Sequence, residues 1–144
     1  MSQLGRAPWG RQRGAAAVEF GLVAVLFLGI LLGAVELGRI MWVWNAAAEA
    51  TRLGARVAVV CDKNDTTVVA LMRERLPYLA NGNVTVAYLP DTCTAQTCTS
   101  VRVTLAGYTH RTLMLIPLNI PIPTFQTTLP KEYMDSTSND ACGP

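Results

Sequence analysis

The chain has 144 residues, 51% of which are hydrophobic, and its formal net charge is +2 at pH 7. A chain of this length accommodates one membrane segment and one small domain, and it excludes a large enzyme. The hydrophobic residues are concentrated in the first third of the sequence. The high apolar fraction therefore reflects one long apolar segment and not an unusually apolar domain.

The N-terminal third consists of a basic leader and a long segment with helical composition. Residues 1–14 contain Pro8 and several glycines, which is typical of an unstructured leader. No proline occurs from Ala15 to Cys61, and alanine, leucine, glutamate and arginine dominate there. This composition predicts one continuous helix of about 45 residues, which would be roughly 70 Å long.

A transmembrane helix is predicted at residues 15–38. No residue from Phe20 to Val35 is charged, and counting from Ala15 gives about the 20 residues that cross a hydrocarbon core of about 30 Å. Residues 39–61 are expected to continue the helix beyond the bilayer as an amphipathic segment. Its apolar stripe consists of Ala50, Leu53, Val57 and Val60, and its charged side of Glu49, Arg52 and Arg56.

The charges on the two sides of the span predict its orientation. Arg6, Arg11 and Arg13 precede the span, and this favours a cytoplasmic N-terminus. The arginines at positions 39, 52 and 56 weaken the argument, because they follow the span. All four cysteines also follow the span, and disulfides form in oxidising compartments. We therefore expect the C-terminal domain to be exported.

Residues 62–144 are expected to form a small exported α+β head with a short antiparallel sheet, packed on the protruding helix. Turn residues, alternating apolar positions and the spacing of the prolines locate its elements. The predicted elements are a helix at Thr66–Leu76 that is capped by Asn64 or Asp65 and ended by Pro77, strands at Asn83–Leu89 and Ser100–Tyr108, and an extended loop or edge strand at Thr124–Leu129.

The four cysteines, Cys61, Cys93, Cys98 and Cys142, favour two disulfides, although three connectivities are possible. The short spacing of Cys93 and Cys98 favours a local pair, which leaves Cys61 to join Cys142. A zinc site is the alternative, but zinc usually requires two close cysteine pairs or added histidines, and His110 is the only histidine. We expect neither a metal nor a cofactor.

Catalytic motifs are missing from the sequence, which contains no GxSxG, P-loop, HExxH or dinucleotide-binding glycine motif. His110 is expected at a strand end, facing solvent. Asp62 and Asp65 are explained by helix capping more simply than by a calcium loop, which needs further oxygen ligands and a glycine turn. Trp42 and Trp44 fit the outer membrane interface and packing against the head equally well. We expect a protein that is not an enzyme.

The most specific signal surrounds the start of the apolar run. The sequence RQRGAAAVEF places arginines before Gly14 and places Glu19 five positions after it. This order resembles the processing site of type IV pilin-like proteins, in which a prepilin peptidase cuts after the glycine, here before Ala15. Further on, ELGR at Glu36–Arg39 and NAAAEATRLGAR at Asn45–Arg56 resemble the core of the TadE-like family, the minor pilins or pseudopilins of the tight-adherence (Tad) pilus system.

The resemblance is close over about residues 13–60, and it differs at Thr51, where the family usually has alanine. It implies a family core of Glu36, Gly38, Arg39, Arg52, Gly54 and Arg56. Glu36 and Arg39 are three residues apart, so they pair within the helix or bridge two subunits.

The resemblance also implies an assembly role for Glu19. After cleavage the new amine of Ala15 can pair with Glu19 of a neighbouring subunit in a low dielectric, which would set the axial register of the incoming subunit. The alternative is that Glu19 only marks the cytoplasmic edge of the span. Gly21, Gly29 and Gly33 lie on one helix face and allow close helix packing between subunits.

Cleavage would remove three arginines and leave nine basic against ten acidic residues, so nothing favours nucleic acid as a partner. The resemblance implies an inner-membrane protein with a cytoplasmic N-terminus and a periplasmic head, which takes part in assembling a pilus for surface adherence. Its implied partners are the prepilin peptidase, other major and minor pilins, the inner-membrane assembly platform and the lipid bilayer. The alternative is a signal-anchored periplasmic domain that binds a ligand or partner and is neither processed nor assembled.

Overall fold

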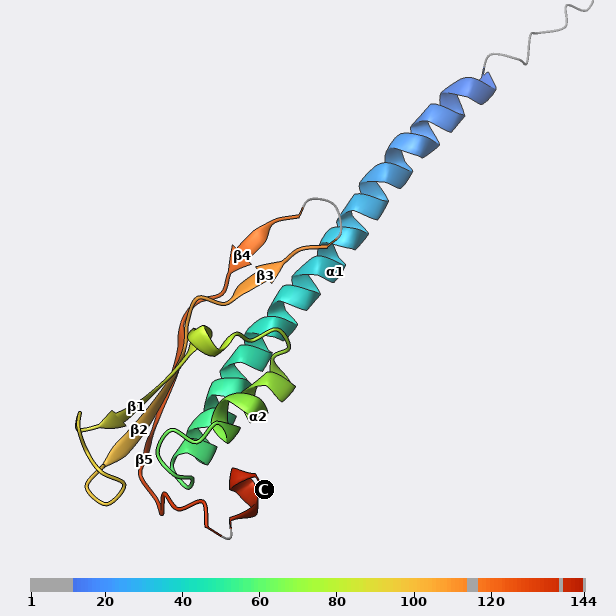
Figure 1. The fold of residues 1–144 in the computed structure, drawn as a ribbon. Helices are drawn as coiled ribbons and strands as arrows, with labels where there is room; N and C mark the ends of the chain where they lie inside the picture. Colours follow the sequence, from blue (N-terminus) through green and yellow to red (C-terminus); the bar gives the residue numbers. More distant parts are fainter. Residues whose placement is uncertain (1–11, 114–116, 138, 144) are drawn as a thin grey trace, which may run out of the picture.

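The computed structural model of the chain contains one long helix that carries a small α+β head on its C-terminal half (Figure 1). The structure describes residues 12–113, 117–137 and 139–143. The expected α+β class, with a long N-terminal helix followed by a domain with a short antiparallel sheet, is confirmed. A leader is expected at residues 1–14, and its residues 1–11 lie outside the described residues.

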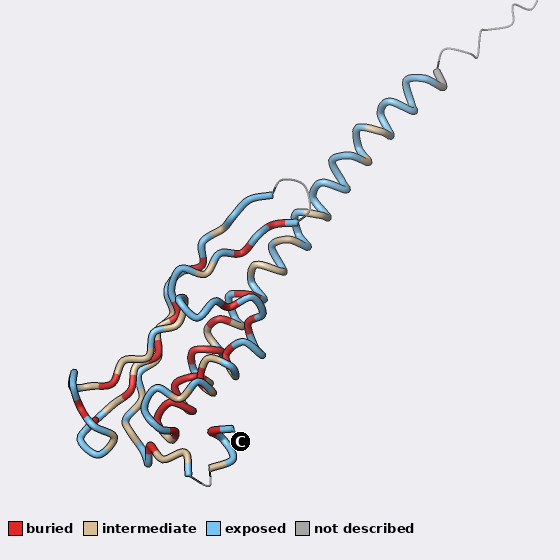
Figure 2. Tube along the Cα trace, in the orientation of Figure 1, coloured by how far each residue is buried: buried red, intermediate tan, exposed pale blue. Residues whose placement is uncertain are grey.

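Helix α1 (Gln12–Ala58) runs without a break through both parts of the molecule. Its N-terminal half extends away from the head, and Figure 2 shows it almost entirely as exposed. Apolar side chains such as Phe20 and Ile30 are therefore about three-quarters exposed, at 75% and 73%. Among the described residues this is the one helix that is long and apolar enough to cross a membrane, and it is compatible with a single-pass anchor.

The head consists of a short helix and two small antiparallel sheets. Helix α2 is followed by a three-stranded sheet in the order β1-β2-β5 and by a separate β3–β4 hairpin. The bounds are α2 Thr67–Arg75, β1 Val84–Leu89, β2 Ser100–Leu105, β3 Thr109–Arg111, β4 Asn119–Pro121 and β5 Phe125–Pro130, with short 3-10 turns at Asn81–Asn83 and Asp140–Cys142. In the register of the larger sheet, Val103 lies opposite Val86 on one side and Thr127 on the other.

The observed strands agree with the expected ones except at one place. The strand expected at Ser100–Tyr108 ends at Leu105, because Gly107 adopts a left-handed conformation with φ of 69°. The chain turns there and then enters β3, which pairs with β4. Several prolines follow Arg111, and they hid this hairpin from the sequence pattern.

The core lies where α1 is covered by α2 and by the larger sheet. Small residues of α1, such as Ala47 and Ala50, are fully buried and let these elements approach closely. Of the expected apolar stripe, Ala50 and Val57 are buried, whereas Leu53 and Val60 pack partly buried against the core. The hydroxyl of the buried Thr51 donates to the carbonyl oxygen of Ala48 at 2.8 Å, so it leaves no unsatisfied polar group in the core.

Candidate functional site

The N-terminal end of α1 carries the residues of the expected processing site. Gly14, Ala15 and Glu19 all lie in the helix and are exposed. No hydrogen bond or ion pair involves the Glu19 carboxylate within the part of the chain that the structure describes. Its charge is therefore available to a group from outside the subunit.

The three glycines of the expected packing face are open to contact. A Cβ atom added at Gly21, Gly29 or Gly33 would meet nothing within 4 Å. No part of the head that the structure describes reaches these positions, so a second helix can approach the backbone there.

Two charged residues of the family core take part in a cluster that joins α1 to the head. The Arg39 guanidinium lies 3.1 Å from Oε2 of Glu36, and His110 Nε2 lies 3.3 Å from Oε1 of the same carboxylate. The Glu36 and His110 side chains are only 12% and 7% exposed. Since β3 carries His110, this cluster attaches the hairpin to the helix.

The expectation that His110 faces solvent is wrong. The residue is 6% exposed, because its strand packs on α1 at the level of Glu36. A single sequence gives no signal that joins two positions so far apart in the chain. Glu36 and Arg39 were expected to pair within the helix or to bridge two subunits. In the structure they pair within the helix.

The remaining family-core residues fall into two groups. Arg52 and Arg56 are exposed, and Arg52 lies 3.9 Å from Glu49 in an exposed pair, which contributes little to stability. Gly54 is buried directly under Met72 of α2, and a Cβ atom at this position would lie 2.6 Å from Sδ of that methionine. Gly38 has open space around it. Gly54 therefore serves the fold, whereas the two arginines present charge on the surface.

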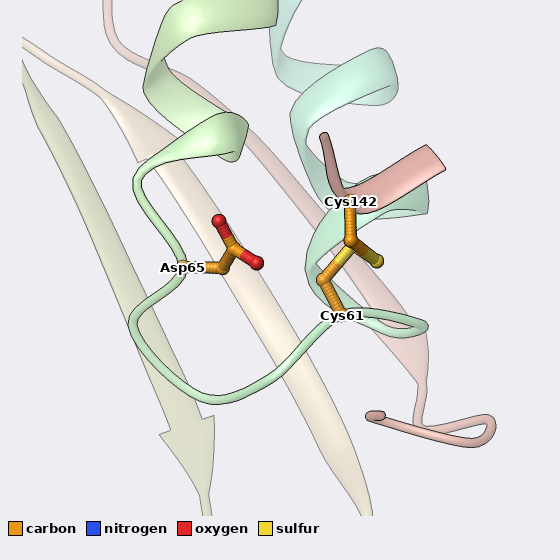
Figure 3. A group of neighbouring side chains, drawn as sticks. All are labelled: Cys61, Asp65 and Cys142. Atoms are coloured by element: carbon orange, nitrogen blue, oxygen red, sulfur yellow. A yellow bond between two sulfur atoms is a disulfide. The ribbon is translucent and has the colours of Figure 1, made fainter. Parts of the chain in front are cut away.

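The cysteines form the disulfides Cys61–Cys142 and Cys93–Cys98. Figure 3 shows that Asp65 lies beside the first of them. The two sulfur atoms are bonded to each other, so neither is a free thiolate that could bind a metal. Asp65 instead accepts hydrogen bonds from the backbone N–H of Thr67 at 2.9 Å and from the hydroxyl of Ser136 at 2.8 Å.

These hydrogen bonds explain the electrostatics of Asp65. The backbone N–H of Thr67 lowers the pKa of the Asp65 carboxyl, and burial only partly opposes it. The N-cap position of α2 is Thr66, which makes no side-chain cap hydrogen bond. Of the two expected caps, Asp65 is the one whose side chain accepts a backbone N–H at the start of α2. Asn64 instead has φ of 67°, and its N–H donates to the hydroxyl of Tyr88 at 2.8 Å.

The two tryptophans have different surroundings. Trp44 packs edge-to-face on Phe125 of β5, with 6.4 Å between the ring centroids, so it packs against the head. Trp42 is 60% exposed and lines a groove of about 630 Å³ between α1 and the hairpin. The groove is also lined by Arg39, Tyr78, Tyr108, His110 and Arg111.

In comparisons with known proteins, one segment of the chain matches a protein family. Residues 14–56 match the model of the family described as TadE-like protein. No curated protein and no solved structure matches the chain. The TadE-like family is not a family of enzymes. The resemblance seen in the sequence is thus confirmed over residues 14–56, where the chain carries a TadE-like segment, and the match supports a general role as a minor pilin associated with the Tad pilus.

Proposed function

We propose that this chain is a TadE-like minor pilin that a prepilin peptidase cuts between Gly14 and Ala15, and that takes part in assembling a Tad-type pilus for surface adherence. The observation that carries the proposal is the TadE-like match at residues 14–56 on a helix whose apolar N-terminal half is uncovered by the head. A helix with so many exposed apolar side chains needs a bilayer or other helices around it. In a pilin, this helix lies in the bilayer before assembly and among the helices of other subunits after assembly.

The position of Glu19 supports assembly through α1. Cleavage would make Ala15 the first residue of the helix, one turn before Glu19, and its amine would add a positive charge at that end. A carboxylate and an ammonium group that are both in a low dielectric stabilise each other only when they are paired. With no partner among the described residues of its own subunit, Glu19 is free to pair with the amine of a neighbour and so to fix its axial position.

The open faces of Gly21, Gly29 and Gly33 support the same arrangement. Small residues let the backbones of two membrane helices approach, which strengthens van der Waals packing where no hydrophobic effect operates between helices. We place the mature protein in the inner membrane with residues 15–38 as the span, the N-terminus in the cytoplasm and the head in the periplasm. Its partners are then the peptidase, other pilins and the assembly platform.

The first experiment is the N-terminal sequence and intact mass of the protein from membranes of strains with and without the prepilin peptidase. A start at Ala15 that depends on the peptidase is the expected result. An uncut leader in both strains would overturn the proposal and would leave a signal-anchored periplasmic domain that is not assembled.

A second experiment separates assembly from processing. Glu19→Ala is expected to be inserted in the membrane but to abolish pilus assembly, because the incoming subunit loses its charged partner. Glu49→Ala is the matched control, since it removes an exposed carboxylate from the same helix in a region beside the head. Normal pilus yield with the Glu19 variant would show that this carboxylate only marks the membrane edge.

A further inference from the structure

The groove between α1 and the β3–β4 hairpin brings cationic and aromatic side chains together. Helix α1 lines it with Arg39 and Trp42, and the segment around β3 lines it with Tyr108 and Arg111. Tyr78, which follows α2, lines it as well. The groove encloses about 630 Å³, which is within the range of about 300–1,000 Å³ of small-molecule sites. Its size and its side chains suit a ligand that is charged and partly apolar.

Positive charge is in excess in this groove. None of the described residues that line it is acidic, and the sequence has no acidic residue from position 92 to position 131, which includes the whole hairpin. Glu36 lies outside the lining and contacts Arg39 at 3.1 Å and His110 at 3.3 Å, so it balances one cation. Arg111 is exposed and has no ion pair within the described part of the chain. A negatively charged ligand would therefore complement the groove.

The groove lies at a defined level along α1, where Arg39, Trp42 and Val43 line it. The proposed membrane span ends at residue 38, and the placement of the groove in the bilayer rests on that span. At 1.5 Å per residue, positions 39–43 of the helix lie about 2–8 Å beyond its end. Lipid headgroups occupy about 5–8 Å on each side of the hydrocarbon core. The wall that α1 contributes is therefore at the depth of the hydrated headgroups of the outer leaflet.

Two aromatic rings of the groove suit that layer. Trp42 and Tyr78 are 60% and 96% exposed, so neither ring belongs to the core of the head. Tryptophan and tyrosine are favoured at membrane interfaces, because their rings are apolar and carry a polar group. The Tyr108 hydroxyl, in contrast, donates to the carbonyl oxygen of Pro77 at 3.0 Å. This hydrogen bond joins the segment before β3 to the end of α2 and holds two walls of the groove together.

We propose that the groove binds the headgroup of an anionic phospholipid of the outer leaflet, with Arg111 as the principal ligand of its phosphate. A guanidinium group presents a planar fork of N–H donors that matches two phosphate oxygens. Arg39 contacts Glu36 through one nitrogen, so its other donors can face the same phosphate. Only the headgroup needs to enter the groove, while the acyl chains stay in their leaflet.

An acidic partner protein is the competing occupant, and the depth of the groove favours the lipid. Phosphate groups form a continuous layer at that depth, so a phospholipid reaches the groove from its ordinary position. Basic pockets beside membrane spans bind lipid headgroups through the same combination of charge and position. An anionic headgroup, such as that of phosphatidylglycerol, fits better than a choline headgroup, because choline brings a further cation next to two arginines.

Native mass spectrometry of the full chain tests this inference. The protein would be released from vesicles of equal parts phosphatidylglycerol and phosphatidylcholine, and the lipids that stay bound would be identified. Arg111→Gln removes the principal ligand and keeps a polar side chain. Arg56→Gln is the matched control, because Arg56 is also exposed but lies in the last turn of α1, outside the groove. Near-UV circular dichroism verifies that both variants keep the fold of the head.

We expect the natural chain and the Arg56 variant to retain several-fold more phosphatidylglycerol than phosphatidylcholine, and the Arg111 variant to lose this preference. Equal lipid retention by all three proteins would overturn the inference. Displacement of the lipid by millimolar inorganic phosphate would also overturn it, because the groove would then be a site for a soluble anion. Unchanged lipid retention in the Arg111 variant together with a reduced yield of pili would assign the groove to an acidic partner protein instead.

The lipid site and the proposed function fail in different ways on the same preparations. A chain that is integrated in the membrane and begins at Ala15, but that retains the two lipids equally, would refute the lipid site alone. An uncut chain whose preference for phosphatidylglycerol depends on Arg111 would refute processing and assembly as a pilin and would support the lipid site.

Discussion

A Cβ atom at Gly54 would lie 2.6 Å from Sδ and 3.0 Å from Cγ of Met72, and 3.5 Å from Cγ1 of Val103. Glycine is therefore required at this position by the close approach of α2 to α1. Gly38, another glycine of the TadE-like segment, has no atom within 4 Å of such a Cβ. The two positions differ only in what covers them, because both lie inside the same helix.

We expect Gly54→Ala to destabilise the head and Gly38→Ala to leave it unchanged or slightly more stable. Replacing a helical glycine by alanine gains up to about 1 kcal/mol of helix propensity. At Gly54 the overpacking against Met72 costs about 1–3 kcal/mol, so the net effect is a loss. Thermal unfolding in detergent, followed by near-UV circular dichroism, measures the stability of both variants. Equal stability of the two variants would show that α2 does not hold Met72 against α1.

Asp65 predicts a pH dependence of stability. Its carboxyl has a lowered pKa in the folded chain because the N–H of Thr67 stabilises the charged form. The folded state therefore binds the proton less readily than the unfolded state does. The stabilisation is complete above the ordinary aspartate pKa and is lost as the pH falls through the folded value.

We expect Asp65→Asn to lower the free energy of unfolding by about 1 kcal/mol at pH 7, because the amide keeps an acceptor for the N–H of Thr67 but loses the charge that strengthens the hydrogen bonds. The difference from the natural chain should shrink as the pH falls below about 4. Urea titrations at a series of pH values measure it. Asp62→Asn is the control, because the contact of Asp62 with Ser136 is made by its backbone N–H, which donates to Ser136 Oγ and is kept in the variant. A difference that stays constant down to pH 2 would contradict the role of the charge.

At the scale of elements, the β3–β4 hairpin depends on α1. A two-stranded hairpin is marginally stable by itself in water, and this one has only three residues in each strand. The close approach of His110 to Glu36 joins it to the helix. The larger sheet does not share this dependence, because Val101, Val103 and Leu105 bury it in the core.

His110→Ala should therefore loosen the hairpin without unfolding the head. Loss of a buried side-chain partner costs about 1–3 kcal/mol, which corresponds to hydrogen exchange that is about 5- to 150-fold faster. The amides of Thr112 and Ile122, which bond within the hairpin region, are the reporters, and those of β2 should stay protected. Arg111→Ala is the control, since that side chain is exposed. Unchanged exchange in the His110 variant would show that the cluster of Glu36, Arg39 and His110 does not attach the hairpin to α1.

The elements also show how far the sequence determines this fold. The absence of proline predicted α1, the capping residues and Pro77 predicted α2, and alternating apolar positions predicted β1 and β2. For the segment that forms β5, the prolines left both an extended loop and an edge strand open. These patterns failed at the hairpin, because Gly107 and the following prolines interrupt any strand pattern although the backbone still pairs. The cluster of Glu36 and His110 is a contact between distant positions, and one sequence contains no signal for it.

At the scale of the whole molecule, one helix joins two environments. At 1.5 Å per residue, the 47 residues of α1 are about 70 Å long, which is more than twice the thickness of a hydrocarbon core of about 30 Å. The head occupies the helix from the level of Glu36 onward. A displacement of the N-terminal half is therefore transmitted to the head through continuous helix and not through a flexible linker.

The position of the span along α1 can be tested with two matched charges. Val25 and Met41 are similarly exposed, at 72% and 65%, so a lysine at either position leaves the packing of the head intact. At the centre of a span a lysine costs about 2.5–3.5 kcal/mol of insertion, whereas beyond residue 38 it lies in water. We expect Val25→Lys to reduce the membrane-integrated fraction after carbonate extraction and Met41→Lys to leave it unchanged. Equal effects of the two lysines would mean that the bilayer is not centred on the first half of the helix.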